Sequence, residues 1–300
     1  MGIKGKILHL HDYSVNDGSG IRTTVFFAGC SLSCRWCANP EGWEERNRIL
    51  YVASRCVRCG RYVAVCPNGI SFDFLAPHDC ECCTGCGACT EACLTMASKN
   101  IVTEYTAKDI IKHLERELNV LRRSGSGVAY SGGECTAQAA FLSEISGEVY
   151  DTGLSQDMET SGYFDLKELS PVLQRTDLLF IDIKCMDAAC HHEWTGVDNG
   201  KILKNIAALG KKRGSVVIRV PVIMGVNWDD GNIRVTARFA GKNMREPMME
   251  LIPYHSYGAD KYTQLGLTYN KEKFRTPSKE ELRHLKKIIE SEDVRVVSFA

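Results

Sequence analysis

Cysteine is concentrated in one stretch of this chain of 300 residues. Of the 15 cysteines, 12 lie between Cys30 and Cys93, and only Cys135, Cys185 and Cys190 lie outside that stretch. A small disulfide-linked secreted domain is the ordinary explanation for so many cysteines, but this chain is long and its cysteine count is odd. In a reducing compartment, grouped cysteines bind metal or take part in redox chemistry. The sequence therefore predicts metal centres in this stretch.

The first group is a C-x3-C-x2-C loop formed by Cys30, Cys34 and Cys37, directly after the β-prone run 25–27. Three thiolates on a short loop can hold three of the four irons of a cubane cluster. The fourth iron is then left without a protein ligand, and an open position on a metal allows a small molecule to bind. A structural zinc site or three buried thiols is the plain alternative.

Two ferredoxin-type runs follow. The run 83–93 has the spacing C-x2-C-x2-C-x3-C, which is specific for a 4Fe–4S cluster. The run 56–66 keeps this spacing, but Tyr62 stands where the third cysteine belongs.

In two-cluster ferredoxins the fourth cysteine of each run binds the other cluster, and this exchange predicts two auxiliary ligand sets. The complete set is Cys83, Cys86, Cys89 and Cys66. The other set is Cys56, Cys59 and Cys93, and it is one ligand short. Three readings stay open for it: a fourth ligand from Cys80 or Cys82, a three-iron or labile cluster, or a zinc site.

The chain divides into three predicted blocks: 1–50 with the first strand and the cysteine loop, 51–102 as a cysteine-rich insert, and 103–300 with alternating helices and strands. One helix is predicted from Thr106 to Arg122, where Thr106 and Asp109 have capping-box spacing. Another begins at Ser278. Short β-rich runs predict strands at 25–27, 128–130, 178–181, 216–218, 249–252 and 294–299.

Strands that alternate with helices predict right-handed βαβ units and a parallel sheet. The polar motifs follow the strands, and the carboxyl ends of the strands carry the chemistry in a parallel barrel. About six strands would give a partial barrel, open on one side, which suits a large substrate.

Charge and hydropathy exclude other classes of function. Lys and Arg together number 37, as do Asp and Glu, so the net charge of zero gives no electrostatic case for a nucleic-acid partner. No apolar run approaches the length of a membrane span. Residues 1–10 lack the apolar stretch of a signal peptide, so we expect a cytoplasmic protein.

Several short motifs together resemble one family, the glycyl-radical enzyme activases of the radical S-adenosylmethionine (SAM) superfamily, in the form that carries a ferredoxin-like insert. The motifs are Asp17–Arg22, Cys30–Cys37, Trp36–Glu41, Ser131–Glu134, Glu159–Gly162, Asp182–Lys184, Thr195–Gly196, Arg219–Pro221 and Leu251–His255. Residues 36–43 and 261–266 are most similar to activases of arylacetate decarboxylases. The resemblance implies an α/β fold: a partial (β/α)6 radical SAM barrel with an inserted ferredoxin-like iron–sulfur domain.

The resemblance also implies roles for individual residues. Cys30, Cys34 and Cys37 would carry the catalytic cluster, whose open iron binds SAM. The implied SAM-binding residues are Trp36, Gly132, Gly133, Glu134, Lys184, Arg219 and His255, with Glu134 accepting from the SAM ammonium. Glu159, Thr160 and Asp182 resemble a site for a monovalent cation, and Asp17 would contact the incoming glycyl loop. The plain alternatives are an ordinary turn at 132–134, salt bridges at Glu159 and Asp182, and a core or surface histidine at His255.

The implied reaction is reductive cleavage of SAM, followed by abstraction of a hydrogen from a backbone glycine of a partner enzyme. A ferredoxin or flavodoxin would supply the electron, and one or two auxiliary 4Fe–4S clusters would lie in the insert. The alternatives are an electron-transfer iron–sulfur protein and a radical SAM maturase of another protein target.

The chain departs from the family pattern at several positions. Ser19, Ser31, Leu94 and Cys135 stand where the family has proline, which loosens each loop without removing a ligand. Cys135 is interpreted either as a neutral replacement or as an adventitious ligand. Tyr62 is more serious, because it puts one auxiliary cluster in doubt.

Overall fold

The computed structural model describes residues 2–69, 83–123, 126–269 and 273–299. Its main element is a nine-stranded sheet in the order β11-β10-β9-β8-β7-β6-β2-β1-β5. These strands are β1 (Lys4–Ser14), β2 (Arg22–Phe27), β5 (Thr103–Thr106), β6 (Gly127–Gly132), β7 (Ser155–Thr160), β8 (Leu178–Asp182), β9 (Val216–Val222), β10 (Met248–Pro253) and β11 (Arg295–Val296). From β2 to β11 all neighbours are parallel, whereas β1 pairs antiparallel with both β2 and β5.

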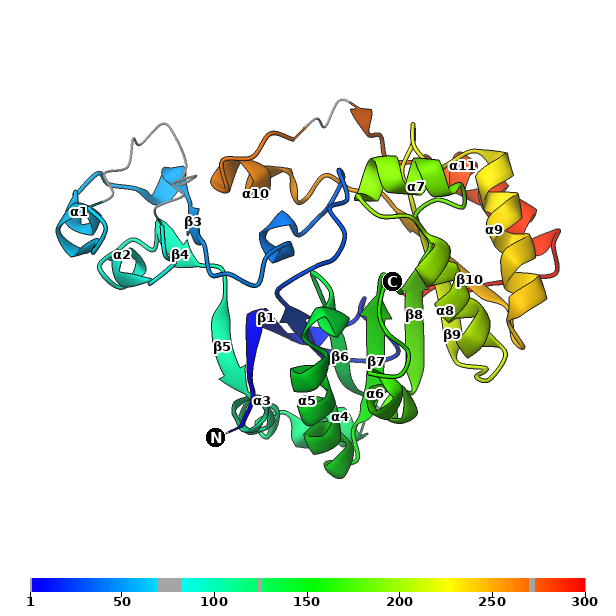
Figure 1. Ribbon diagram of the computed structural model, residues 1–300, viewed down its shortest axis with the longest axis horizontal. Coiled ribbons are helices and arrows are strands. Elements are labelled where there is room, and N and C mark those ends of the chain that lie inside the picture. The colour runs from blue at the N-terminus through cyan, green and yellow to red at the C-terminus, as the bar shows by residue number, and fades with distance from the viewer. Residues whose placement is uncertain (1, 70–82, 124–125, 270–272, 300) are drawn as a thin grey trace.

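Helices cover one face of this sheet (Figure 1). They are α3 (Ala107–Leu114), α4 (Leu118–Arg123), α5 (Ala139–Asp151), α6 (Ser170–Arg175), α8 (Gly200–Gly210), α9 (Asp230–Asn243) and α11 (Lys279–Glu290). Two other helices, α7 (Ala188–Thr195) and α10 (Ala259–Gln264), lie beyond the edge of the sheet. The main core lies between this layer and the sheet, where strand residues such as Ile181 and Ile218 pack with helix residues such as Ile145 and Ile206. The fold is thus the predicted α/β architecture, a parallel sheet of six main strands with crossover helices.

Two predicted elements differ from the observed ones. The helix predicted over 106–122 begins with the expected capping box, in which Thr106 and Asp109 bond reciprocally, but it breaks into α3 and α4. Between them Glu117 is buried and accepts a hydrogen bond from Thr23 Oγ1. The strand predicted over 294–299 is short, because the chain after β11 turns so that Phe299 packs on Phe180.

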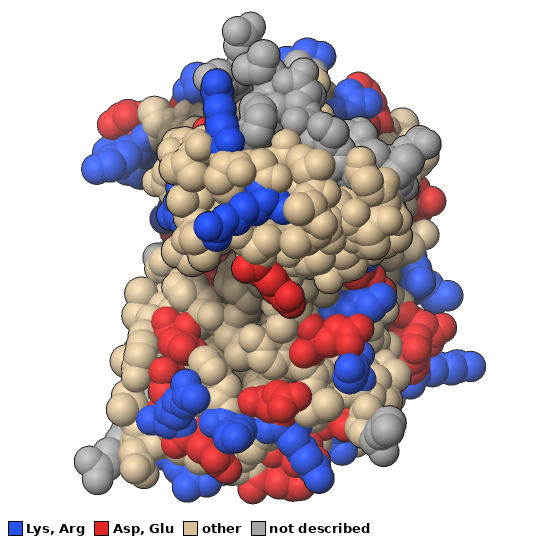
Figure 2. Space-filling model, turned by 90° about the vertical axis from the view of Figure 1, so that its left-hand side faces the viewer, with Lys and Arg blue, Asp and Glu red and all other residues tan. Residues whose placement is uncertain are grey.

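The insert extends from one end of the sheet (Figure 1). It carries η2 (Ala53–Arg55), α1 (Arg61–Val65) and α2 (Ala88–Glu91), and β3 (Ile49–Tyr51) pairs antiparallel with β4 (Ser98–Asn100) at its base. On the face that presents it, charged side chains crowd the lower part of the molecule, while the insert is mostly uncharged (Figure 2). Its exposed apolar side chains include Val57, Leu94 and Met96. The domain boundaries at 50 and 102 stay predictions.

In the described part of the chain, every helix is too short or too polar to cross a membrane.

Candidate active site

The loop after β2 carries Cys30, Cys34 and Cys37. Backbone hydrogen bonds anchor it at both ends: Cys30 donates to Trp43 at 3.1 Å, and Ser33 donates to Thr195 at 2.8 Å. The short helix η1 (Pro40–Gly42) follows the loop. The loop is therefore fixed by its own chain at the carboxyl edge of the sheet.

The environment of the three sulfurs suits metal ligation. The backbone amides of Leu32 and Asn39 point at the sulfurs of Cys30 and Cys37, each at 3.4 Å, an arrangement that stabilises thiolates bound to an iron–sulfur cluster. Burial raises the pKa of Cys37 to about 12, and it also raises the pKa of Cys30 and Cys34. Bare thiols here stay protonated at neutral pH, so a bound cation is what would hold them as thiolates.

The glycines after β6 are required by close packing within the chain. Gly132 has a φ of +117°, and a Cβ there would lie 2.3 Å from the backbone nitrogen of Phe27. A Cβ on Gly133 would lie 2.3 Å from the carbonyl oxygen of Gly42. The pair thus lets the end of β6 press against the cysteine loop, a use of glycine that was not predicted.

Glu134 links the ends of two strands. It is 2% exposed, and its carboxylate accepts hydrogen bonds from the backbone amides and hydroxyls of Thr136 and Ser161 and from the hydroxyl of Thr160. Five donors contact its two oxygens, and the contact of Glu134 with the SAM ammonium stays a prediction. Its carboxylate positions the loops that follow β6 and β7.

Replacing Glu134 with alanine is expected to lower the free energy of unfolding by about 3 kcal/mol or more, because several buried donors lose a charged acceptor. Glu134→Gln should lie between alanine and wild type, since one of its oxygens becomes an amide that faces donors. Thermal unfolding of the reconstituted protein measures the effect, and exposed Glu168→Ala is the matched control. Equal midpoints for Glu134→Ala and Glu168→Ala would contradict this role.

A buried ion network spans three strands on the face of the sheet opposite the helices. Arg219 of β9 bonds to Glu250 of β10 at 2.7 Å and to Glu159 of β7, and Ser131 donates to Glu159 at 2.8 Å. The guanidinium also lies over the ring of Phe180, 3.7 Å from its centre. Burial raises the pKa of Glu159, an effect that Arg219 opposes.

One donor of this network is unused. Arg219 is 7% exposed, yet its buried Nη2 has no hydrogen-bond partner among the described residues. A buried unpaired donor of this kind is rare without a ligand or water. Arg219 therefore fits a bound molecule with an acceptor oxygen, as a SAM carboxylate or ribose would provide.

The end of β8 turns a cation toward the cysteines. Lys184 Nζ lies 2.6 Å from Asp182. Burial disfavours its charge, but Asp182 and Cys34 outweigh burial and raise the pKa of Lys184. Lys184 thus keeps its charge beside the cysteine loop.

The side chains of the predicted cation site contact protein partners in this structure. Glu159 pairs with Arg219, Asp182 pairs with Lys184, and the Thr160 hydroxyl donates to Glu134. Glu159 and Asp182 thus each form a salt bridge, and a monovalent cation at these residues stays a prediction. Across the described ranges, no three His, Cys, Asp or Glu side chains converge as they would around a single ion.

Two other predicted residues lie near the loop in different settings. Trp36 is buried and packs against Trp194 and Phe274, with ring centres 6.2 and 6.3 Å away. His255 follows β10 and stacks on exposed Tyr257, with ring centres 4.6 Å apart. Their contact with SAM stays a prediction.

Cys135 is a core residue. It is fully buried, and its thiol points at the carbonyl oxygen of Glu159, 3.5 Å away. Burial, and then the charge of Glu134, raise its pKa well above the usual value, so it is a neutral thiol. This favours the neutral-replacement interpretation.

The aspartate expected to meet the glycyl loop is held in place by hydroxyl groups. Asp17 accepts from Ser14 at 2.7 Å and from Thr24 at 2.8 Å. The buried carboxylate of Asp157 accepts from the backbone of Ser19 at 2.9 Å and pairs with Arg22. The loop 17–20 is thus fixed without the proline that the family pattern has.

Helix α10 forms a clasp on the cysteine loop that the sequence did not predict. Lys261 of α10 contacts Asn39 at 2.7 Å and Glu41 at 2.5 Å, and the Tyr262 hydroxyl donates to the carbonyl of Cys37 at 3.1 Å. Nothing in the local pattern of α10 pairs it with a loop more than 200 residues earlier, so only the fold reveals this contact.

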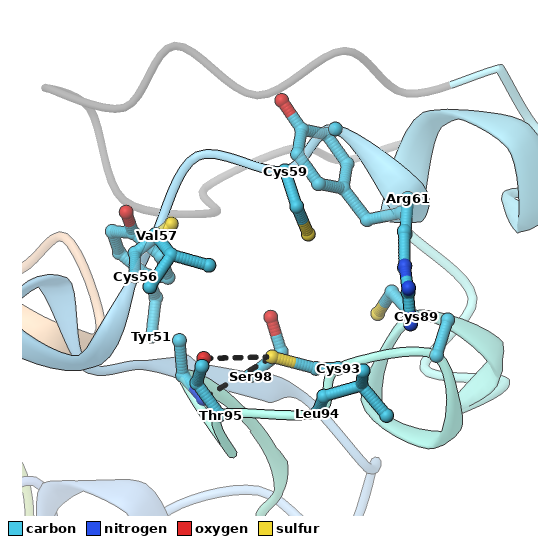
Figure 3. Close-up of a pocket in the computed structure, with 14 residues that line it drawn as sticks. Tyr51, Cys56, Val57, Cys59, Arg61, Cys89, Cys93, Leu94, Thr95 and Ser98 are labelled. Carbon is cyan, nitrogen blue, oxygen red and sulfur yellow. Dashed lines mark hydrogen bonds between the residues drawn. The ribbon is translucent and has the colours of Figure 1, made fainter.

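The insert brings its cysteines to two cavities. One, of about 240 Å³, is bordered by Cys56, Cys59 and Cys93 together with Tyr62 (Figure 3). The other is lined by Cys66, Cys83, Cys86 and Cys89. The cysteines thus group as the predicted exchange requires, although Cys89 borders both cavities. Cys80 and Cys82 lie outside the described residues.

Comparison with known proteins agrees with this site. Residues 16–203 match the family model described as a 4Fe-4S single cluster domain. The chain is 35% identical to the 4-hydroxyphenylacetate decarboxylase activating enzyme of Clostridium scatologenes, over 95% of this chain and 94% of that protein. It is 33% identical to the indoleacetate decarboxylase activating enzyme of Tractidigestivibacter scatoligenes, over 98% and 97%.

A solved structure with the same fold is a radical SAM methyltransferase from Sphaerobacter thermophilus, with a TM-score of 0.53 and 14% identity, over 92% of this chain and 65% of that one. The buried three-cysteine loop, the unpaired arginine donor and near-full-length similarity to activating enzymes lead to one conclusion. The chain belongs to the glycyl-radical enzyme activating enzymes of the radical SAM superfamily.

Proposed function

We propose that the protein activates a partner glycyl-radical enzyme by placing a radical on one of its backbone glycines. The observation that carries this proposal is the loop of Cys30, Cys34 and Cys37, whose buried sulfurs are aligned with backbone amides and adjoin Lys184 and Glu134. When bound, the cluster supplies the electron that cleaves SAM, which yields methionine and the 5'-deoxyadenosyl group that takes the glycine hydrogen.

The chain's own residues bind SAM and position the loops around it. Arg219 offers an unpaired donor, and Lys184 keeps a positive charge beside the loop. Glu134 fixes the two neighbouring loops, while α10 clasps the loop from the other side. No acid–base pair is needed, because the protein's tasks are orientation and exclusion of water.

The relatives support a common radical step with different partners. Those with 33–35% identity include activating enzymes of two arylacetate decarboxylases and of a trans-4-hydroxy-L-proline dehydratase. Since these partner reactions differ, we infer that activation of a glycyl-radical enzyme is what these proteins have in common. We further infer a ferredoxin or flavodoxin as reductant and a cytoplasmic location, because the proposed chemistry needs a low-potential electron and reduced thiols.

The test is anaerobic reconstitution with iron and sulfide, followed by SAM, a reductant and a purified glycyl-radical enzyme. The expected result is 5'-deoxyadenosine together with a stable glycyl radical detected by electron paramagnetic resonance. A partner whose glycine is changed to alanine is the matched control and should give no radical. Absence of SAM binding in calorimetry would favour an electron-transfer protein. Production of 5'-deoxyadenosine with no radical on any glycyl-radical partner would favour a maturase.

A further inference from the structure

The insert is an internal repeat whose halves are offset by 27 residues. Left-handed backbone occurs at matching positions in both: Arg58 and Gly85, Gly60 and Gly87, Gly69 and Met96. A positive φ is uncommon for arginine or methionine, so its recurrence in register reflects one loop geometry formed twice.

Hydrogen bonds repeat with the same offset. Val63 donates to Gly60 at 3.0 Å, as Thr90 does to Gly87 at 2.8 Å. Gly69 donates to Cys66, as Met96 does to Cys93, each at 3.1 Å. The short helices α1 and α2 both begin after a left-handed glycine. The two half-repeats therefore share a backbone, and Tyr62 occupies the position that Cys89 has in the other half.

The residues that line the two cavities are related by the same offset of 27 residues. The complete set consists of Cys83, Cys86 and Cys89 from the second half and Cys66 from the first half. The residues 27 positions before Cys83, Cys86 and Cys89 are Cys56, Cys59 and Tyr62, and the residue 27 positions after Cys66 is Cys93. These four equivalent residues all border the larger cavity. Two sulfurs there accept from backbone amides: Cys56 from Arg58 at 3.4 Å and Cys93 from Ala97 at 3.2 Å. Figure 3 shows Cys56, Cys59 and Cys93 arranged around this space. The donor set fits an iron–sulfur cluster with one corner lacking a thiolate.

Tyrosine does not replace cysteine as a ligand at this backbone position. A cysteine sulfur is one bond from Cβ, whereas a tyrosine oxygen lies beyond a whole aromatic ring. A phenol starting where Cys89 starts in the other half would reach past the corner iron rather than bind it.

We propose that the larger cavity holds a three-iron cluster bound by Cys56, Cys59 and Cys93, because Tyr62 leaves the fourth corner without a thiolate. This inference rests on the iron–sulfur chemistry of the proposed function, but not on SAM cleavage. It makes the two auxiliary sites unequal: one four-iron cluster with four cysteines, and one three-iron cluster.

The experiment uses the full chain with Cys30, Cys34 and Cys37 changed to alanine, so that only the insert binds clusters. After anaerobic reconstitution and mild oxidation, we expect about seven irons per chain and the paramagnetic signal of an oxidised three-iron cluster. An oxidised four-iron cluster is diamagnetic and gives no such signal. Because this background lacks the SAM-binding cluster, the result is independent of whether the proposed activation occurs.

Three further changes in that background make the test specific. Tyr62→Cys should remove the signal and raise the iron content to about eight per chain. The matched control, Val63→Cys, adds a thiol at the neighbouring exposed position and should leave the signal unchanged. Cys93→Ala should abolish the signal by removing one of the three thiolates.

Other outcomes overturn the proposal. About eight irons and no signal before Tyr62 is changed would mean a complete four-iron cluster, and loss of its iron on changing Cys80 or Cys82 to alanine would identify the fourth ligand. About four irons and no signal would mean that the larger cavity binds no cluster. A signal that survives Cys93→Ala would place the three-iron cluster elsewhere.

Discussion

Changing Cys30, Cys34 and Cys37 together to alanine is expected to reduce 5'-deoxyadenosine formation below detection, a loss of at least about 1,000-fold. The physical reason is that the three sulfurs are the only described thiols on the loop after β2, and alanine offers no metal ligand. Without the cluster there is no electron donor at the sulfonium and no iron to bind SAM. The assay is chromatography of the products after anaerobic incubation with SAM and dithionite.

Cys190→Ala is the matched control for this loss. Cys190 is a half-buried thiol on α7, away from the cysteine loop in sequence, and its removal should leave product formation within about twofold of wild type. The triple variant should also lose the iron of one cluster while keeping the clusters of the insert. If the triple variant still made 5'-deoxyadenosine, the assignment of the catalytic loop would be wrong.

Arg219→Met is expected to have the second largest effect. Methionine nearly fills the same volume but leaves the carboxylates of Glu159 and Glu250 buried without a cation. Breaking a buried ion pair by removing one partner costs about 3–5 kcal/mol of folding free energy. SAM binding should fall with it, because the unpaired Nη2 donor is also lost. Calorimetric SAM titration and thermal unfolding measure the two effects.

The loss of folding stability caused by Arg219→Met should increase as pH rises. Burial already raises the pKa of Glu159, and Arg219 opposes that rise. A carboxyl group whose pKa is higher in the folded protein stabilises the fold below its unfolded pKa and loses that contribution as pH rises through its folded pKa. Removing Arg219 raises the folded pKa of Glu159 further, so the variant should lose stability relative to wild type as pH rises above the ordinary range of a carboxyl group.

Arg234→Met is the control for this pH series. Arg234 pairs with Glu292 at 2.9 Å on the surface, where solvent screens the pair and its contribution to stability is small. Its destabilisation should be small and nearly constant with pH. A pH-independent effect of Arg219→Met would show that lost packing, rather than unpaired charge, explains its instability.

Local patterns predicted most of the sheet. The runs at 128–130, 178–181, 216–218 and 249–252 lie within β6, β8, β9 and β10, because strands buried on both faces are continuous apolar stretches. The last two strands on one side of the sheet, β1 and β5, were less visible, and central β7 was not predicted either. β1 alternates polar and apolar residues and β5 is short and polar, so neither forms an apolar run. Their antiparallel pairing depends on contacts that no local pattern records.

In the candidate site, too, contacts within one loop could be predicted from the sequence, whereas contacts between distant segments could not. Spacing within a loop predicted how the cysteines group, because ligands two to four residues apart must lie close together. The partners of the charged residues could not be predicted in this way. Arg219 meets Glu250, 31 residues later, because β9 and β10 pair in a register that aligns them, and Glu134 meets Ser161 across two strand ends. Cross-strand register, rather than sequence spacing, decides those contacts.

The course of the chain after β11 has a practical consequence for handling this protein. The ring of Phe299 packs edge-on against Phe180, and the backbone amide of Phe299 donates to Glu250, the same carboxylate that binds Arg219. An affinity tag or fusion partner joined directly behind this residue would start beside the ion network and pull on it. Gly2 and Ile3, the first described residues, are exposed, so labels and surface-immobilisation handles are better placed near them.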